Sequence, residues 1–167
     1  MIKVGIITAS DKGARGERED KSGVMIKEVV EQWGYQVKDS IILPDEQTLL
    51  AEKMRAWCDS EYVDLILTTG GTGFSKRDCT PEATLDVIEK HVPGIPEAMR
   101  YYSLQITPRA MLSRSEAGIR KNTLIINLPG SPKAVKENLE SILPSLEHGI
   151  QILKGSATEC AMPIKES

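Results

Sequence analysis

The sequence predicts an α/β fold in a single domain, with a doubly wound, mostly parallel sheet flanked by helices in three α/β/α layers. Apolar runs typical of buried strands alternate with segments whose apolar residues recur at helical spacing. The chain has 167 residues, which suits one domain with a substantial core. It shows no internal repeat and no linker, so we expect one domain over residues 1–153 and a C-terminal tail over residues 154–167.

Four apolar runs are predicted as strands. They cover residues 4–9, 35–43, 63–69 and 123–128. The third run is fully apolar at its centre, as expected of a strand that helices cover on both faces. Strands that alternate with helices pair in parallel, which favours the doubly wound sheet.

Helical spacing is clearest in four segments. They cover residues 24–33, 49–57, 80–91 and 135–143. Asp20 or Ser22 can cap the first helix, and Thr80 can cap the third. We expect Pro144 to divide the fourth helix from a last helix that continues through Leu153.

Two stretches give weaker signals. Residues 11–20 are charged and contain glycine, which predicts a surface loop. Residues 93–120 are interrupted by three prolines, so we expect short helical pieces there.

A loop rich in polar or glycine residues follows each predicted strand. The four loops are Thr8-Ala9-Ser10-Asp11, Pro44-Asp45-Glu46, Thr69-Gly70-Gly71-Thr72-Gly73 and Pro129-Gly130-Ser131-Pro132. Right-handed crossovers bring such loops to one edge of a parallel sheet, where open α/β sheets bind ligands. We therefore expect one composite site for a phosphorylated or nucleotide ligand.

The sharpest motif is the glycine loop, which we define as Thr69 to Gly73. Its three glycines permit positive φ and close approach of the backbone to a ligand, and its N–H groups and threonine hydroxyls can hold an anion. The loop has neither the ending of a Walker A motif nor the spacing of the dinucleotide fingerprint. A flexible turn is the alternative, but three glycines after a buried strand favour binding.

Two carboxylates beside these loops suit a metal. Asp45 and Asp78 can together hold Mg²⁺, which prefers a few carboxylates with water and phosphate oxygens. Each has a structural alternative: Asp45 is a natural N-cap for the next helix, and Asp78 can be a solvated or capping loop residue. For Asp78 taken alone, the structural alternative is favoured.

Two of the other loops have ambiguous chemistry. Ser10 and Asp11 can equally cap a helix or bind the ligand. Pro129–Pro132 combines a sharp turn with a helix N-terminus, whose N–H groups can bind an anion or simply begin the helix.

Five further residues are candidate phosphate contacts. Lys76 and Arg77 can hold pyrophosphate, although a solvated surface pair fits them equally well. Ser113, Arg114 and Arg120 can reach a phosphate from the irregular segment.

Composition narrows the class of protein. The net charge of −3 argues against a general nucleic-acid binder, which is usually basic. We identify no signal peptide and no apolar run that is long enough to span a membrane. The chain has three cysteines, Cys58, Cys79 and Cys160. Their odd number and spacing argue against a disulfide framework and a zinc site, which indicates a reducing compartment. We expect a cytoplasmic protein that binds neither nucleic acid nor membranes.

The motifs, taken in order, resemble those of the molybdopterin adenylyltransferase family of molybdenum cofactor biosynthesis, to which the gephyrin G domain is related. The resemblance covers about residues 2–153. It rests on Thr68-Thr69-Gly70-Gly71-Thr72-Gly73, Arg77-Asp78, Thr80-Pro81-Glu82-Ala83-Thr84, Pro129-Gly130-Ser131-Pro132, Ser10-Asp11 and Pro44-Asp45-Glu46.

The resemblance implies a reaction and a set of site residues. In this family the terminal phosphate of molybdopterin attacks the α-phosphorus of Mg-ATP, which gives adenylyl-molybdopterin and pyrophosphate. Asp45 and Asp78 match the family's essential acidic positions and are implied to be catalytic and to bind Mg²⁺. The resemblance implies that one pocket binds both substrates through Ser10, Asp11, Thr69, Gly70, Gly71, Thr72, Gly73, Arg77, Ser113, Pro129, Gly130, Ser131 and Pro132.

The resemblance also implies a homotrimer that hands its product to a separate metal-insertion protein. A non-catalytic molybdopterin-binding carrier or a scaffold module of the same fold is the alternative. The presence of both Asp45 and Asp78 favours the enzyme.

Overall fold

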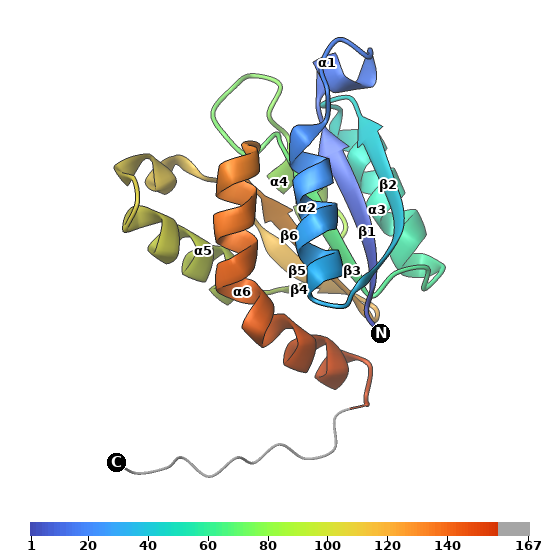
Figure 1. The fold of residues 1–167 in the computed structure, drawn as a ribbon. Helices are drawn as coiled ribbons and strands as arrows, with labels where there is room; N and C mark the ends of the chain where they lie inside the picture. The colour runs from blue at the N-terminus through green and yellow to red at the C-terminus, as the bar shows by residue number, and fades with distance from the viewer. Residues whose placement is uncertain (157–167) are drawn as a thin grey trace.

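A computed structural model describes residues 1–156 and shows a six-stranded sheet with helices on both faces (Figure 1). The strands are β1 (Lys3–Ala9), β2 (Gln36–Leu43), β3 (Leu65–Thr69), β4 (Lys90–His91), β5 (Ala117–Arg120) and β6 (Thr123–Leu128). The helices are α1 (Asp11–Ala14), α2 (Lys21–Gln32), α3 (Gln47–Asp59), α4 (Thr80–Leu85), α5 (Gly94–Leu104), α6 (Pro132–Leu153) and the 3₁₀ helix η1 (Pro108–Leu112). The predicted fold class is confirmed.

The sheet has the order β2-β1-β3-β6-β5-β4. The pairs β1–β2, β1–β3 and β3–β6 are parallel, so four strands end at the same edge. The chain leaves β1 for β2 on one side and later returns to β3 on the other. This reversal opens a crevice beyond the ends of β1 and β3, where doubly wound sheets bind ligands.

The helices form one layer on each face of the sheet. Helices α2 and α6 lie side by side on one face, with α5 beside α6, and α3 and α4 cover the other face (Figure 1). Each face has its own apolar core, because alternate side chains of the central strands point to opposite sides. Leu65 and Leu67 pack toward α2 and α6, whereas Ile66 packs toward α3.

The prediction of helical pieces throughout residues 93–120 was wrong at its end. Residues 117–120 form β5, which pairs antiparallel with β6 through a two-residue turn. Strand β4 then pairs with β5, so the helix predicted over 80–91 ends at Leu85. Both strands have only four residues or fewer, which is too short for a periodic signal to show.

The prediction that Pro144 divides the last helix was wrong. Pro144 lies on the exposed side of a continuous α6. Proline has no N–H to donate to the carbonyl one turn earlier, but on this side water can donate to that carbonyl instead. Leu139, Leu143 and Leu146 are buried on the other side and keep the helix on the core. The predicted surface loop over residues 11–20 also contains a short helix, α1, capped by the Ser10 hydroxyl.

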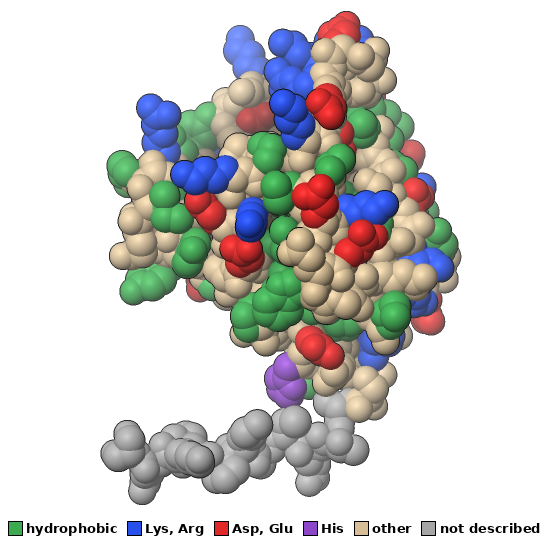
Figure 2. Space-filling view, viewed as in Figure 1, with side chains coloured by type: hydrophobic (Ala, Val, Ile, Leu, Met, Phe, Trp, Pro, Cys, Tyr) green, Lys and Arg blue, Asp and Glu red, His purple; other side chains and the backbone are tan. Residues whose placement is uncertain are grey.

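Figure 2 shows acidic and basic side chains interspersed with apolar ones over the face formed by α2 and α6. Within residues 1–156, no helix combines the length and the apolar composition needed to cross a membrane. Of the predicted tail, residues 157–167, including Cys160, lie outside the described residues.

Leu67 gives a test of the core, because its side chain is fully buried in the central strand β3. We expect Leu67→Ala to lower the free energy of unfolding by about 2–5 kcal/mol, since the substitution leaves a cavity. Urea denaturation measures the change. Leu85→Ala makes the same change at an exposed position of α4 and should cost less than about 0.5 kcal/mol. Equal losses would contradict the placement of β3 in the core.

Candidate active site

The four predicted loops meet at the edge where β1, β2, β3 and β6 end. They surround two separate cavities rather than one. Figure 2 shows Lys and Arg side chains gathered at the end of the molecule that carries α1. The four loops lie at the same end. A chain of net negative charge therefore has local positive charge near the site.

The first cavity, which we call the acidic cavity, has a volume of about 230 Å³. Three aspartates line it: Asp20, Asp45 and Asp78. The other lining residues are Thr8, Ala9, Ser10, Gly13, Arg18, Glu19, Ser22, Gly70, Gly71 and Gly130. Backbone from three loops and several carboxylates thus face the same space.

The second cavity, which we call the α5–α6 cavity, has a volume of about 310 Å³ and a mostly apolar lining. Helices α5 and α6 and the 3₁₀ helix η1 provide most of its walls. Four residues of the predicted site line this cavity: Thr72, Gly73, Ser113 and Pro129. Ser10, which was expected to line the same pocket as Ser113, lies in the acidic cavity instead.

The glycine loop separates the two cavities. Gly70 and Gly71 face the acidic cavity, and Thr72 and Gly73 face the α5–α6 cavity. Gly70 and Gly71 have φ of 86° and 67°, which favour glycine. A Cβ at Gly70 would lie 2.3 Å from the Ala9 carbonyl oxygen, so the loop can cross the end of β1 only without a side chain there.

Asp45 and Asp11 bind each other's backbone. The Asp11 N–H donates to Asp45 Oδ2 and the Asp45 N–H donates to Asp11 Oδ1, each over 3.0 Å. Arg77 donates two hydrogen bonds to the Asp11 carboxylate, which hold the pKa of Asp11 below its usual value. Burial raises the pKa of Asp45 above its usual value, and the negative charges of Asp11 and Asp78 act in the same direction. Asp45 does not cap α3, where Glu46 holds that position.

Asp78 is fixed by the glycine loop itself. Its Oδ2 accepts hydrogen bonds from the N–H groups of Gly73 and Ser75, both over 3.1 Å. Neither Asp78 Oδ1 nor Asp45 Oδ1 accepts a hydrogen bond from residues 1–156. Each carboxylate therefore keeps one oxygen for a ligand in the acidic cavity.

These two oxygens decide how well the site suits Mg²⁺. Residues 1–156 contain no group of three or more His, Cys, Asp or Glu arranged to hold a metal. Asp45 and Asp78 would thus give a cation two protein ligands and leave the others to water and phosphate. This is the donor set that Mg²⁺ favours in nucleotide sites.

Arg114 was a candidate phosphate contact, but it holds the protein together instead. Its side chain donates to the carbonyls of Gly73, over 2.7 Å, and Asp78, over 3.1 Å, and forms an ion pair with Glu82. Its N–H also donates to the Thr72 carbonyl. Arg114 therefore ties the irregular segment to the glycine loop.

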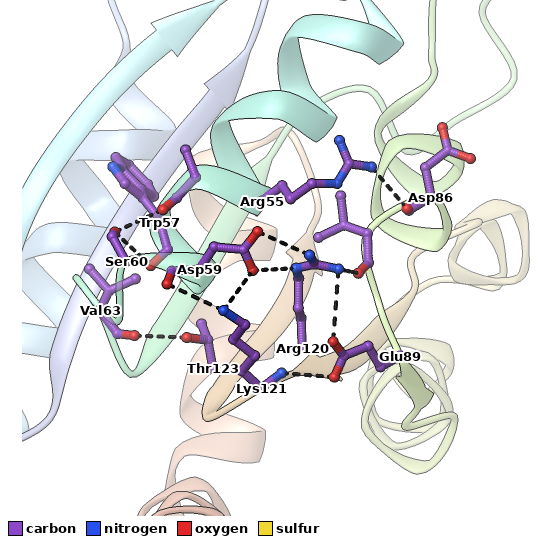
Figure 3. A network of polar contacts seen from close by, with 12 residues as sticks. Arg55, Trp57, Asp59, Ser60, Val63, Asp86, Glu89, Arg120, Lys121 and Thr123 are labelled. Carbon is purple, nitrogen blue, oxygen red and sulfur yellow. Dashed lines mark hydrogen bonds and ion pairs between the residues drawn. The ribbon is translucent and has the colours of Figure 1, made fainter.

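Arg120 lies at the opposite edge of the sheet, so its prediction as a phosphate contact was wrong. It forms two hydrogen bonds with the Asp59 carboxylate and donates to the Val87 carbonyl (Figure 3). Lys121 forms an ion pair with Asp59, and Arg120 forms a second ion pair with Glu89. This network joins α3, the segment between α4 and β4, and β5, away from the residues that line both cavities.

The remaining predicted residues are not among those that line either cavity. The Thr69 hydroxyl donates to the Pro129 carbonyl over 2.6 Å, which links the loops after β3 and β6. Ser131 caps α6 by accepting from the Ala134 N–H, with Pro132 in the first turn. Arg77 is exposed and engaged with Asp11.

Sequence reasoning missed Asp20 as a site residue. It caps α2 as expected, but its Oδ2 also accepts from the Thr8 hydroxyl over 2.8 Å, and it lines the acidic cavity. Its place in a long charged run gave no sign of this position. The walls of the α5–α6 cavity that come from residues 99–110 were missed because the prolines hide the helix there.

Gly70 gives a test of the loop crossing. We expect Gly70→Ala to lower the free energy of unfolding by about 3 kcal/mol or more, because it adds a backbone collision to an unfavourable φ. Gly34→Ala is the matched control: it has a φ of 79° and open space around it, so it should cost about 1–2 kcal/mol. Thermal unfolding of both variants makes the comparison. Equal costs would show that the Ala9 carbonyl is not in the way.

Asp45 gives a test of the electrostatics. Because its pKa is raised in the folded state, its ionisation costs stability, which is lost as the pH rises from the usual pKa of an aspartate through the raised pKa. We expect Asp45→Asn to raise the melting temperature at pH 7, and we expect the gain to vanish as the pH falls below the usual pKa of an aspartate. A pH series of melting curves measures this. A gain that persists unchanged in acid would contradict the raised pKa.

Comparison with known proteins identifies the family. A family model described as "Probable molybdopterin binding domain" matches residues 5–148. The molybdopterin adenylyltransferase of Helicobacter pylori is 42% identical over 157 residues, which are 93% of this chain and 89% of that protein. Gephyrin of Dictyostelium discoideum is 42% identical over 160 residues, which are 90% of this chain and 22% of gephyrin.

A solved structure agrees with this match. The molybdopterin biosynthesis enzyme MoaB from Thermus thermophilus superimposes with a TM-score of 0.88 and is 48% identical. The match covers 93% of this chain and 98% of that one. The predicted family is confirmed: the chain belongs to the molybdopterin binding domain family of molybdenum cofactor biosynthesis proteins.

Proposed function

We propose that this protein is a molybdopterin adenylyltransferase that transfers AMP from Mg-ATP to the terminal phosphate of molybdopterin. The observation that carries the proposal is the pair of cavities that share the glycine loop as part of their lining. One cavity is lined by carboxylates, hydroxyls and glycines, and the other is mostly apolar. Two substrates of different chemistry can therefore meet across one loop. Relatives with this name, at 37–42% identity, support the same activity.

The acidic cavity is the proposed nucleotide site. Gly70, Gly71 and Gly130 bring backbone close to the triphosphate, which no larger residues would allow. Ser10 can add a hydrogen bond, although its hydroxyl also caps α1. Asp45 and Asp78 are the proposed catalytic residues and would hold Mg²⁺ through their remaining oxygens.

Bound Mg²⁺ would offset the negative charge of the triphosphate, which otherwise repels both carboxylates and the incoming phosphate. The raised pKa of Asp45 fits this role, because a carboxylate that is costly to leave charged gains from a nearby cation. Arg77 is exposed beside the cavity and is proposed to contact the pyrophosphate, which it can reach by exchanging its bonds with Asp11.

The α5–α6 cavity is the proposed molybdopterin site. Its volume of about 310 Å³ and mostly apolar walls suit a flat heterocycle. Thr72, Gly73, Ser113 and Pro129 line its side nearest the acidic cavity, where the terminal phosphate would lie. Thr69, Ser131 and Pro132 support the loops from behind.

The proposed reaction needs positioning more than a protein nucleophile. An oxygen of the molybdopterin phosphate bonds to the α-phosphorus, and the bond from that phosphorus to the bridging oxygen breaks to release pyrophosphate. A phosphate monoester is already mostly ionised at pH 7, so no base has to remove a proton from it. In-line alignment across the glycine loop then supplies the main advantage.

We further propose that the protein is a cytoplasmic homotrimer that passes its product to a metal-insertion protein. Exposed apolar side chains on α5 and η1, such as Tyr101 and Met111, support an assembly that would cover them.

The direct test is pyrophosphate release with Mg-ATP and molybdopterin. We expect Asp45→Asn and Asp78→Asn each to lower the rate by about 10²-fold or more, because each removes charge beside the reacting phosphates. Asp86→Asn is the matched control: it makes the same chemical change at the exposed end of α4 and should leave the rate unchanged.

A folded wild type that binds molybdopterin without releasing pyrophosphate would contradict the enzyme and favour the carrier. Retained activity in both aspartate variants would contradict their catalytic role.

A further inference from the structure

We infer that Thr84 and Asn127 are positioning residues that set the conformation of Gly70 and Gly71 from within the core. Neither side chain lines either cavity. Both are fully buried, and a chain of hydrogen bonds joins them to the backbone of the glycine loop through Thr80. The inference rests on the proposed function for its effect on turnover, but its structural part can be tested separately.

Thr80 is the link that touches the loop. Its hydroxyl donates to the Gly70 carbonyl over 2.9 Å, and its N–H donates to the Gly71 carbonyl over 3.1 Å. Two successive carbonyls are thus turned toward the start of α4. A Cβ at Gly71 would lie 2.4 Å from Thr80 Oγ1 and 3.1 Å from Asp45 Oδ1, so Thr80 and the proposed catalytic Asp45 flank the same glycine.

Thr84 lies one helical turn after Thr80 and fixes its backbone. The Thr84 hydroxyl donates to the Thr80 carbonyl over 3.0 Å and accepts from Asn127 Nδ2 over 2.8 Å. Since the hydroxyl has one proton and gives it to Thr80, its bond with Asn127 requires Asn127 as the donor. Thr84 is therefore held from both sides.

Asn127 anchors the chain in the sheet. Its Oδ1 accepts from the Glu116 N–H over 3.1 Å, and its Nδ2 donates to the hydroxyls of Thr68 and Thr84. Every hydrogen-bonding position of its amide except one acceptor lone pair is used, and the side chain is completely buried. It connects β6 with β3, with α4 and with the residue that precedes β5.

Burying such a series of hydrogen-bonded side chains costs free energy and has an advantage only if it fixes a conformation. Buried polar groups gain little net stability over apolar side chains of similar shape, but they define one geometry because each donor must meet its acceptor. This chain ends on the carbonyls of the loop that faces the proposed triphosphate site. Its removal should therefore affect the acidic cavity and leave the α5–α6 cavity, whose loop residues Arg114 holds, nearly unchanged.

The test uses isosteric threonine variants of full-length protein. Thr84→Val keeps the shape and removes the hydroxyl, whereas Thr84→Ser keeps the hydroxyl. Thr123→Val is the matched control: Thr123 is also buried and donates to a backbone carbonyl, that of Val63, but at the opposite edge of the sheet (Figure 3). If Thr84→Val does not fold, Thr80→Val removes the hydroxyl bond to the Gly70 carbonyl and keeps the N–H bond to the Gly71 carbonyl.

We expect Thr84→Val to lower kcat/KM for Mg-ATP by about tenfold, because the loop shifts by a fraction of an ångström. Thr84→Ser should restore most of the activity, and the Kd for molybdopterin should stay within about twofold in every variant. Loop exchange, measured as hydrogen exchange at the Thr80 amide that donates to the Gly71 carbonyl, should accelerate by about tenfold in Thr84→Val and remain unchanged in Thr123→Val.

Equal behaviour of Thr84→Val and Thr123→Val in both kcat/KM and loop exchange would overturn the inference. If the wild type makes no adenylylated product, the proposed function fails, and loop exchange together with the Kd for Mg-ATP still decides the role of Thr84.

Discussion

The close approach of Gly70 to the end of β1 is the constraint on which the rest of the site depends. Any side chain at Gly70 would collide with the Ala9 carbonyl, so the loop after β3 can cross the switch point only as bare backbone. This crossing brings Gly71 beside Asp45 and Gly130 beside Gly70. The same loop lines both cavities, with Gly70 and Gly71 on the acidic cavity and Thr72 and Gly73 on the α5–α6 cavity.

The surroundings of the loop supply order on one side and charge on the other. Arg114 and Thr80 hold its carbonyls from inside the protein, so the loop does not depend on a ligand for its conformation. On the open side, Asp20, Asp45 and Asp78 gather negative charge in a partly buried space. Negative charges held this close repel one another, so a cation bound among them would have a large effect. The cost in stability at Asp45 and the proposed chemistry therefore have the same physical origin.

Much of the architecture could be predicted because its signals are local. The four parallel strands are apolar runs, and the loops after them carry glycine, serine and aspartate, so their meeting at one edge followed from topology alone. Strands β4 and β5 could not be predicted, because their pairing with β6 is non-local and their lengths give no period. Continuity of α6 through Pro144 depends on which side of the helix is exposed, and only packing decides that.

The site shows the same division between what could and could not be predicted. The motif residues were placed at the correct edge, but no local pattern indicates that two cavities divide them or that Arg114 and Arg120 bind the protein itself. The partners that decide the role of each arginine are about 30 to 60 residues away along the chain.

The central claim is that nucleotide and molybdopterin occupy different cavities at the same time. Calorimetric titration of Mg²⁺ and α,β-methylene-ATP, which cannot release pyrophosphate, into free protein and into protein saturated with molybdopterin tests it most directly. The account predicts one nucleotide per chain in both titrations, with Kd values that agree within about threefold. Competition between the two ligands, seen as a nucleotide Kd that rises in proportion to the molybdopterin concentration, would contradict it.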